Sequence, residues 1–276
     1  MRLFRVSAAA ALAVIALGLA ACADDSSDGG SGGSAFKVGI KFDQPGLGLK
    51  EGSKYTGFDV DVAKYVAKEL GHNEGDIQWV QAPSAQRETL LQSGQVDMIA
   101  ATYSITDERK AKVSFAGPYF VAGQDLLVKA DETEITGPEA LTGKRLCSVT
   151  GSTSAQKVKD KYPGVQLQEF GTYSECVSAL TSGGVDALTT DNTILAGYAA
   201  QDQYKGKLKV VGKTFSEERY GIGIKKGDTA TCEKINTAIQ KMIDDGSWQK
   251  AVDANLGPAG FKPDAAVNPP KPAPCT

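Results

Sequence analysis

Hydroxyl-bearing and charged residues follow an apolar stretch that ends near residue 101, and this group could bind an anion. Thr102 and Ser104 offer hydroxyls, and Thr106 is a residue type that helix N-caps favour. Arg109 then falls at the third helical position, where a capping box would have Glu or Gln. The positive end of the helix dipole disfavours a cation there. An anionic ligand would offset that cost, whereas the alternative is an arginine exposed to solvent.

Two further groups complement this cation. Asp191 ends a second apolar stretch, and its carboxylate could bind an ammonium; the alternative is that it only caps a helix expected over residues 192–200. The segment from Thr150 to Thr153 carries glycine and hydroxyls before another expected helix. Its free N–H groups could bind an anion, although a plain turn and cap would have the same sequence. Together with Arg109, these groups match a zwitterion.

An internal repeat indicates how these residues come together. The stretches LQSGQVDMIAAT (residues 91–102) and LTSGGVDALTTD (residues 180–191) share Leu, Ser, Gly, Val and Asp at a constant offset of 89 residues. Each follows a predicted strand and a predicted helix, so each belongs to a β-α-β unit. Two such units predict parallel sheets in two similar lobes. Ligands of such sheets bind at the carboxyl ends of strands, which places Thr102 and Asp191 at equivalent points.

Apolar periodicity and capping residues define the other elements. The expected strands cover residues 37–42, 77–80, 143–149 and 165–170, and helices are expected over 58–70, 192–200, 232–244 and 247–255 and from residues 84 and 172.

The N-terminus has the pattern of an export signal. Arg2 and Arg5 precede an apolar run that is too short to span a bilayer, and Leu-Ala-Ala-Cys ends at Cys22. This last motif resembles the bacterial lipobox, whose cysteine is lipidated, with palmitate as one expected acyl group; the alternative is a plain cleavage site. We expect a signal peptide at 1–21 and a lipid anchor with a flexible tether at 22–35.

Charge and motifs exclude several classes of function. Without Arg2 and Arg5, 28 basic and 33 acidic side chains remain, a net charge of −5, and no basic cluster is present. Nucleic acid is therefore not an expected partner. No spacing of cysteine and histidine suggests a metal, and no cofactor motif occurs.

Cysteine usage agrees with export. Four cysteines remain after the anchor, an even number that predicts disulfides in an oxidising compartment. Their order in the chain leaves three pairings open, and four free buried thiols are the alternative. The four are Cys147, Cys176, Cys232 and Cys275.

Several separated motifs resemble the polar amino acid-binding proteins of ABC importers, over a stretch from about residue 36 to residue 260. The motifs are GFDVDV (57–62), SITDER (104–109), FAGPYF (115–120) and VTGST (149–153). Two more resemble the glutamate-binding lipoproteins of Gram-positive actinobacteria in particular. These are GIKFDQPGLG (39–48) and SAQRET (84–89).

The resemblance implies an α/β, two-lobed periplasmic-binding-protein type II fold with a hinge of two crossing segments, near residues 123–129 and 215–220. Lobe 1 would comprise residues 36–120 and 220–262, lobe 2 residues 121–219, and residues 263–276 a Pro-rich tail. Disulfides across the lobes would lock this hinge. The implied pairs are therefore Cys147–Cys176 and Cys232–Cys275.

The resemblance also implies a role for each candidate residue. Arg109 would bind the α-carboxylate of an amino acid, with backbone help near Thr153 and Thr150. Asp191 would bind the α-ammonium. Thr102 and Ser104 would assist it.

A glutamate binder needs one more cation, for the ligand's side chain, and the candidates are Lys41 and Arg87. The alternative for Arg87 is a solvated arginine paired with Glu88 or Asp97. A glutamine-specific relative would need no such cation.

The implied function is capture of a polar amino acid: glutamate first, then glutamine, aspartate or asparagine. A monomer, anchored by lipid outside the cytoplasm, would close on its ligand and deliver it to a permease driven by an ATPase. The alternatives are a sensor that feeds a signalling receptor, and a secreted dehydratase-type enzyme on the same fold. No catalytic motif is present, and the only histidine, His72, falls at an expected helix end, so we expect no enzyme activity.

Overall fold

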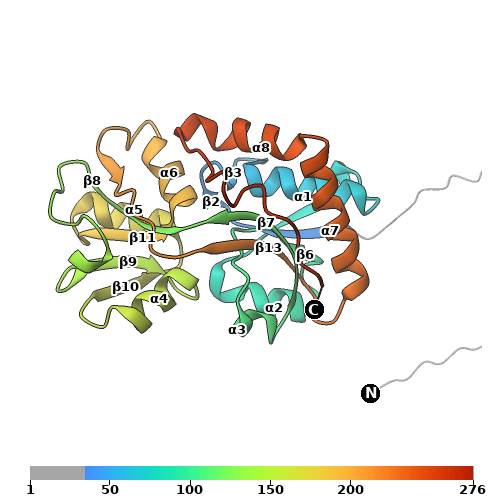
Figure 1. The fold of residues 1–276 in the computed structure, drawn as a ribbon, viewed down its shortest axis with the longest axis horizontal. Helices are drawn as coiled ribbons and strands as arrows, with labels where there is room; N and C mark the ends of the chain where they lie inside the picture. Colours follow the sequence, from blue (N-terminus) through green and yellow to red (C-terminus); the bar gives the residue numbers. More distant parts are fainter. Residues whose placement is uncertain (1–34, 276) are drawn as a thin grey trace, which may run out of the picture. The chain divides into compact units, whose positions relative to one another are not determined.

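The computed structural model describes residues 35–275 (Figure 1). The predicted signal peptide, the lipid-bearing Cys22 and nearly all of the tether lie outside the described residues. Among residues 35–275, no helix combines the length and the apolar character needed to cross a membrane.

The first of two large sheets contains both parallel and antiparallel strands. In spatial order its strands are β5 (Ile77–Gln81), β1 (Phe36–Ile40), β6 (Met98–Ile99), β13 (Glu218–Ile224) and β7 (Ser114–Ala122). β5, β1 and β6 run parallel, as the predicted β-α-β unit requires, whereas β13 is antiparallel to β6 and β7. This sheet and the helices on it form the first lobe.

Helices cover both faces of the first sheet (Figure 1). On one face, α1 (Phe58–Glu69), α7 (Thr229–Asp244) and α8 (Ser247–Asn255) pack against one another. On the other face lie α2 (Arg87–Gln92) and α3 (Asp107–Lys110). The core beneath α1 is aromatic: the ring of Phe58 lies 5.4 Å from that of Phe120 and 6.0 Å from that of Trp248. Edge-to-face contacts of this kind stabilise a core beyond the area they bury.

The second sheet repeats this plan and defines the second lobe. Its strands are β10 (Gln166–Phe170), β9 (Arg145–Val149), β11 (Ala187–Asp191), β8 (Gln124–Lys129) and β12 (Leu208–Val210), in spatial order. β10, β9 and β11 run parallel, and β8 is antiparallel to both of its neighbours. The helices are α4 (Thr153–Lys161), α5 (Tyr173–Ser182) and α6 (Asn192–Ala200).

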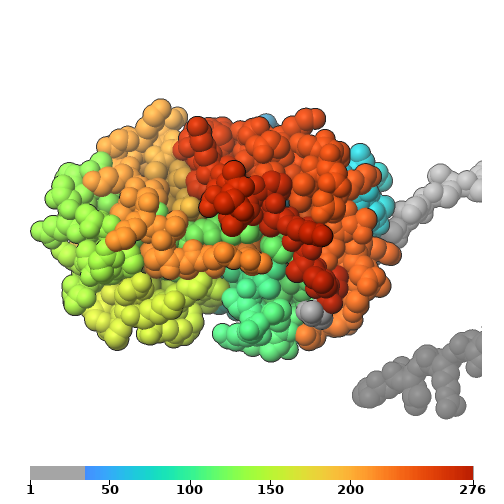
Figure 2. Space-filling model, viewed as in Figure 1, coloured from blue at the N-terminus to red at the C-terminus, as the bar shows by residue number. Residues whose placement is uncertain are grey.

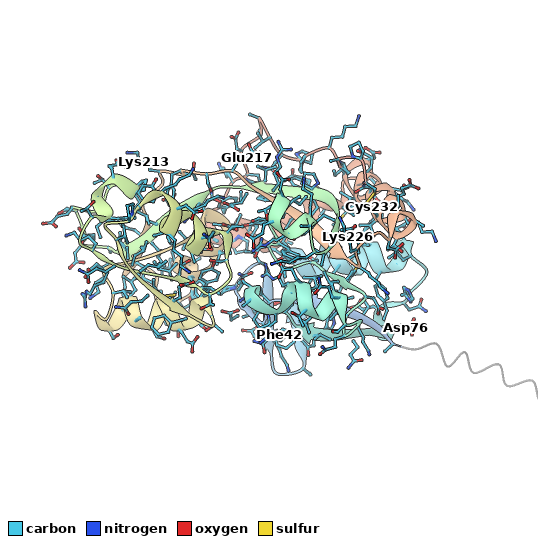
Figure 3. All side chains as sticks on the ribbon, turned by 90° about the horizontal axis from the view of Figure 1, so that it is seen from below. Phe42, Asp76, Lys213, Glu217, Lys226 and Cys232 are labelled. Atoms are coloured by element: carbon cyan, nitrogen blue, oxygen red, sulfur yellow. A yellow bond between two sulfur atoms is a disulfide. The ribbon has the colours of Figure 1, made fainter. Side chains whose placement is uncertain are left out.

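The chain passes between the lobes twice. It leaves the first sheet where β7 continues into β8, and it returns at the start of β13. Figure 3 labels Lys213 and Glu217 on the returning segment. The arrangement is the two-lobed type II fold. We propose lobe limits at residues 36–120 with 220–262 and at residues 121–219, beside these crossings.

Side-chain caps mark the start of α3, α4, α5 and α7. Helices α6 and α8 have the predicted bounds, and the predicted capping box at α5 is present: Glu175 N donates to Thr172 Oγ1 and Thr172 N to Glu175 Oε2. The helix predicted from Ser84 begins with a 3-10 turn (Ser84–Gln86), and the α-helix α2 follows it directly. Helix α7 begins earlier than predicted because Asp228 accepts from Thr231 N.

Some short elements have no clear signal in the sequence. A small antiparallel sheet of β2 (Asp43–Gln44), β3 (Gly48–Glu51) and β4 (Lys54–Thr56) was not predicted. Single 3-10 turns cover Glu74–Asp76, Pro138–Leu141 and Gly257–Ala259.

The Pro-rich C-terminal segment packs on the first lobe. Figure 2 shows it, in dark red, lying along the molecular surface. The side-chain amide of Asn268 exchanges two hydrogen bonds of 2.9 Å with the backbone of Val121, next to the crossing. Ala273 N donates to Gly117 O at 2.7 Å. The tail is therefore tied to β7, the strand that enters the second lobe.

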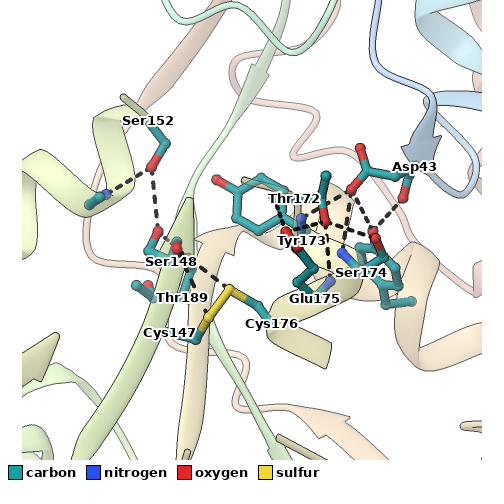
Figure 4. Close-up of a disulfide and its surroundings, with 12 residues drawn as sticks. Asp43, Cys147, Ser148, Ser152, Thr172, Tyr173, Ser174, Glu175, Cys176 and Thr189 are labelled. Carbon is teal, nitrogen blue, oxygen red and sulfur yellow. Dashed lines mark hydrogen bonds between the residues drawn. A yellow bond between two sulfur atoms is a disulfide. The ribbon is translucent and has the colours of Figure 1, made fainter. Parts of the chain in front are cut away.

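Neither disulfide joins one lobe to the other: the first lies within the second lobe, and the second joins the first lobe to the C-terminal segment packed on it. Cys147 pairs with Cys176 and Cys232 with Cys275, at sequence separations of 29 and 43 residues. Figure 4 shows the first pair between β9 and α5. The second pair fastens the tail to α7. Neither pair crosses between the lobes, so both leave the hinge free.

Replacing Cys147 and Cys176 together by alanine should destabilise the protein. Loop-closure entropy predicts a loss of about 3.5 kcal/mol for a loop of this size, or a fall in Tm of roughly 10 °C for a chain this long. Thermal unfolding of the ligand-free protein measures it. The double alanine variant of Cys232 and Cys275 is a second test, because the same account predicts a similar loss of stability for it. A Tm equal to that of the wild type would contradict the prediction.

Candidate ligand-binding site

Predicted residues from both lobes surround one small space at the carboxyl ends of the strands. The predicted residues that line it are Arg87, Thr102, Arg109, Thr153 and Asp191. Sequence reasoning missed the ring of Tyr173 and the side chain of Ile194, which complete the wall from α5 and α6.

Three predicted residues do not line this space. Ser104 is buried behind it, with its hydroxyl 3.5 Å from that of Thr153. Lys41 is also buried, with Nζ 3.4 Å from Asp43 Oδ1. Thr150 is exposed, because Gly151 turns the chain with φ of 75° so that only the residues after it reach the space.

Arg109 is positioned by the short helix α3. Thr106 caps this helix, accepting from Arg109 N at 3.2 Å. Of the guanidinium nitrogens, Nη1 donates to Ser104 O at 2.8 Å and Nη2 to Gly151 O at 3.1 Å, in the opposite lobe. The side chain is not that of a solvated surface arginine, since the residue is only 8% exposed. A guanidinium has five N–H donors, so others remain for a ligand carboxylate.

Asp191 stands at the N-cap of α6, but its side chain does not cap the helix. Its Oδ2 accepts from Tyr220 Oη at 2.7 Å, and its Oδ1 has no hydrogen-bond partner among residues 35–275. The residue is 4% exposed. Burial, together with the nearby Glu218 carboxylate, raises the pKa of Asp191 to about 7. An ammonium beside Oδ1 would both satisfy this oxygen and favour the ionised form.

Glu218 supplies a second negative charge near Asp191. It accepts from Ser216 Oγ at 2.7 Å and from Thr153 Oγ1 at 3.0 Å, and it forms an ion pair with Lys157. Burial alone would raise the pKa of Glu218, but the Lys157 ammonium and these hydrogen bonds outweigh it, and the pKa is lowered. Sequence reasoning missed this residue, which lies where β13 leaves the hinge.

Arg87 carries a buried charge without an acidic partner. The residue is 2% exposed, and Nε donates to Ala82 O at 3.2 Å. Among residues 35–275, no carboxylate oxygen lies within 4.0 Å of its nitrogens. Glu88 instead lies 3.5 Å from Arg109 Nε, and Asp97 accepts from Lys37 N at 2.7 Å. The pairing of Arg87 with Glu88 or Asp97 is therefore wrong.

Both arginines lie near the ring of Tyr103. The guanidinium carbons of Arg87 and Arg109 each lie 5.0 Å from its centroid, a distance that allows cation–π attraction. Its hydroxyl donates to Glu88 Oε1 at 2.8 Å. Burial, and then the nearby Arg109, lower the pKa of Arg87. Two like charges beside one ring favour an anion near both of them.

The lobes also contact each other directly beside the space. Asp43, the first residue of β2, accepts through Oδ2 from Tyr173 N at 3.0 Å and from Ser174 N at 3.3 Å, at the N-terminus of α5 (Figure 4). Tyr198 of α6 donates to the same oxygen at 3.2 Å. The site is therefore enclosed by groups from both lobes.

A two-lobed α/β fold with charged groups converging between the lobes defines a solute-binding protein. The chain belongs to the bacterial extracellular solute-binding proteins, family 3, which it matches over residues 36–258.

Known relatives bind amino acids. The chain is 50% identical to the glutamate-binding protein GluB of Corynebacterium efficiens, covering 92% of this chain and 91% of that one. It is 42% identical to the ABC transporter glutamine-binding protein GlnH of Bacillus subtilis, over 77% of each chain. Among solved structures, an ancestral arginine-binding protein bound to glutamine aligns with a TM-score of 0.75 and 39% identity, covering 81% of this chain and 98% of that one.

Proposed function

We propose that this protein is the glutamate-binding component of an ABC importer. The observation that carries the proposal is the buried guanidinium of Arg87, which has no acidic partner among residues 35–275 and lines the same space as Arg109 and Asp191. A buried charge without a partner is costly. A ligand that brings two carboxylates and one ammonium would compensate all three groups.

In the proposed complex, each charge of glutamate meets an opposite charge. Arg109 binds the α-carboxylate, with N–H groups at the start of α4, near Thr153, as further donors. Asp191 binds the α-ammonium through Oδ1, assisted by Thr102, whereas Ser104 lies behind the space. Arg87 binds the side-chain carboxylate. Glutamine has a neutral side-chain amide and would leave Arg87 without an opposite charge.

Lys41 is the weaker candidate for the side-chain carboxylate. Asp43 already lies within ion-pair distance of its ammonium. Burial lowers the pKa of both Lys41 and Arg87, so the Asp43 carboxylate is what makes an added anion less strongly required at Lys41. Lys41 instead lies 5.7 Å from the centroid of the Tyr173 ring, which lines the space. In the proposed site it supports that wall.

Transport would follow from closure of the lobes on the ligand. Contacts from both lobes favour the closed form, since a ligand shifts the equilibrium by its differential affinity for the two states. The closed monomer would deliver glutamate to a membrane permease whose ATPase subunits provide the energy. Cys22 would anchor the protein by lipid outside the cytoplasm.

Isothermal titration calorimetry with the proteinogenic amino acids tests this function. The chain is purified in detergent, then unfolded and refolded to remove any bound ligand. We expect tight binding of glutamate and weak binding of glutamine. Tight glutamine with weak glutamate would keep the class of protein and reject the side-chain assignment. No binding of any amino acid would reject the proposed function.

Arg87→Ala should bind glutamate and glutamine with similar affinities, whereas the wild type should prefer glutamate. Removing one partner of a buried charge pair costs enough for glutamate affinity to fall by about 30-fold or more, while glutamine should change by less than about threefold. Calorimetry with both ligands measures the two losses. Lys41→Ala is the comparison, and we expect a smaller change in selectivity. Equal losses for both ligands in Arg87→Ala would remove Arg87 from the side-chain pocket.

A further inference from the structure

Thr102 has an unusual backbone conformation for its residue type. Its φ is +47°, and it is the only non-glycine residue between 35 and 275 with a positive φ. L-residues other than glycine rarely occupy this left-handed region, and β-branched residues are especially disfavoured there. Such strain persists only where surrounding contacts impose it, and it often marks a functional site.

The backbone of Thr102 is held by a carboxylate from another element. Thr102 N donates to Asp59 Oδ2 at 2.9 Å, and Tyr119 Oη donates to Asp59 Oδ1 at 2.7 Å. Asp59 lies in the first turn of α1, within the GFDVDV motif, and is 0% exposed. It does not line the ligand space, whereas Thr102 does. The Asp59 carboxylate therefore contacts Thr102 from the side that faces away from the ligand space.

The side chain of Thr102 does not fix this conformation by itself. Its hydroxyl donates to the carbonyl of the preceding residue, Ala101, at 2.7 Å, and lies 3.3 Å from Gln44 Oε1. The hydrogen bond to Asp59 is therefore the contact that fixes the orientation of the Thr102 backbone amide. Without it, the residue would relax toward the β or right-handed region and turn this part of the wall.

We propose that Asp59 is a positioning residue for ligand binding: its carboxylate holds Thr102 in the left-handed conformation that shapes one wall of the amino acid site. The proposal rests on the proposed function, because it assumes that the space beside Thr102 binds an amino acid. A buried carboxylate is expensive to retain for packing alone. Glycine at position 102 would adopt the same conformation without steric cost, so the need for Asp59 should disappear in that background.

The test uses the full chain in detergent, with glutamate affinity by calorimetry and Tm by thermal unfolding. Asp59→Ala should weaken glutamate binding by about tenfold, the loss expected for one strained residue set free. Asp59→Asn, which keeps an acceptor oxygen, should stay within about threefold of the wild type. Thr102→Gly alone also removes the Thr102 hydroxyl from the site, so its affinity is the reference for the double variant.

The double variant separates positioning from stability. Asp59→Ala with Thr102→Gly should bind within about threefold of Thr102→Gly, whereas the Tm lost in Asp59→Ala should not return, because the buried cavity remains. The matched control is Asp61→Ala. Asp61 lies in the same first turn but accepts from Asn255 Nδ2 at 2.6 Å, away from the site, and its removal should leave the affinity unchanged.

Three results would overturn the proposal. They are unchanged affinity in Asp59→Ala, a double variant as weak as Asp59→Ala, and an equal loss in Asp61→Ala. If Asp59→Ala does not fold, the double variant is compared with Thr102→Gly alone; equal affinities support the proposal, and an unfolded double variant overturns it. A wild-type chain that binds no amino acid would contradict the proposed function, and this inference with it.

Discussion

Arg109→Ala is expected to abolish measurable binding of every amino acid, with a loss of about a thousandfold or more. All amino acids share the α-carboxylate, and a guanidinium can bind it through two parallel N–H donors. Removing that partner leaves the carboxylate unpaired in an enclosed site. The variant also loses the hydrogen bond from Nη2 to Gly151 O, which joins the two lobes.

Calorimetry with glutamate, glutamine and aspartate measures this loss. Arg109→Lys keeps the charge without the planar fork, and we expect it to bind with intermediate affinity. The matched control is Arg145→Ala, because Arg145 is paired with Asp186 at the end of β9 that lies away from the site. Micromolar binding retained by Arg109→Ala would show that this arginine does not hold the carboxylate.

Asp191→Asn is expected to weaken binding by about a hundredfold and to remove its pH dependence between pH 6 and 8. In the wild type, the ammonium binds the ionised carboxylate. Because the pKa of Asp191 in the free protein is about 7, only about a tenth of the molecules are ionised there at pH 6 and about nine tenths at pH 8. Glutamate affinity should therefore fall about tenfold from pH 8 to pH 6.

The stability of the ligand-free protein should change in the opposite direction. The folded pKa of Asp191 lies above its unfolded value of 3.8, so the folded form binds the proton more tightly. This site alone therefore makes the protein more stable as the pH falls from about 7 to about 4. Burial also raises the pKa of Asp59, to about 6, with the same sign, so the contribution of Asp191 is the difference between wild type and Asp191→Asn.

Calorimetry and thermal unfolding across this pH range measure both effects. Wild-type affinity that stays constant between pH 6 and 8 would contradict the assignment of Asp191 to the ammonium. An Asp191→Asn variant with the wild-type pH profile would contradict it as well.

Local signals were sufficient for many helices and for the parallel order of the strands. Thr106 and Thr172 cap their helices as predicted, because a cap depends only on residues a few positions apart. The repeat at residues 91–102 and 180–191 predicted two β-α-β units, and each large sheet contains three parallel strands. Arg109 and Asp191 were also expected to lie near each other, and both line the space at the carboxyl ends of the strands.

The partners of the charged side chains could not be predicted from local sequence. Glu88 is next to Arg87 in the chain, yet its carboxylate contacts Tyr103 and Arg109. Lys41 pairs with Asp43, two residues away, but the absence of an acidic partner for Arg87 among residues 35–275 depends on the fold. Such pairings depend on side chains from several elements that meet only after folding, and burial then decides how much each charge requires a partner.

The sequence by itself therefore determined the class of this protein: its fold, its repeated units and the Arg109 and Asp191 motifs, since each is encoded by residues close together in the chain. Only the tertiary structure decided that Arg87 is a buried cation without an acidic partner among residues 35–275 and that Asp59 holds Thr102 in its left-handed conformation. These are properties of contacts between distant segments, and their free energy comes from burial and hydrogen-bond geometry that no local pattern records.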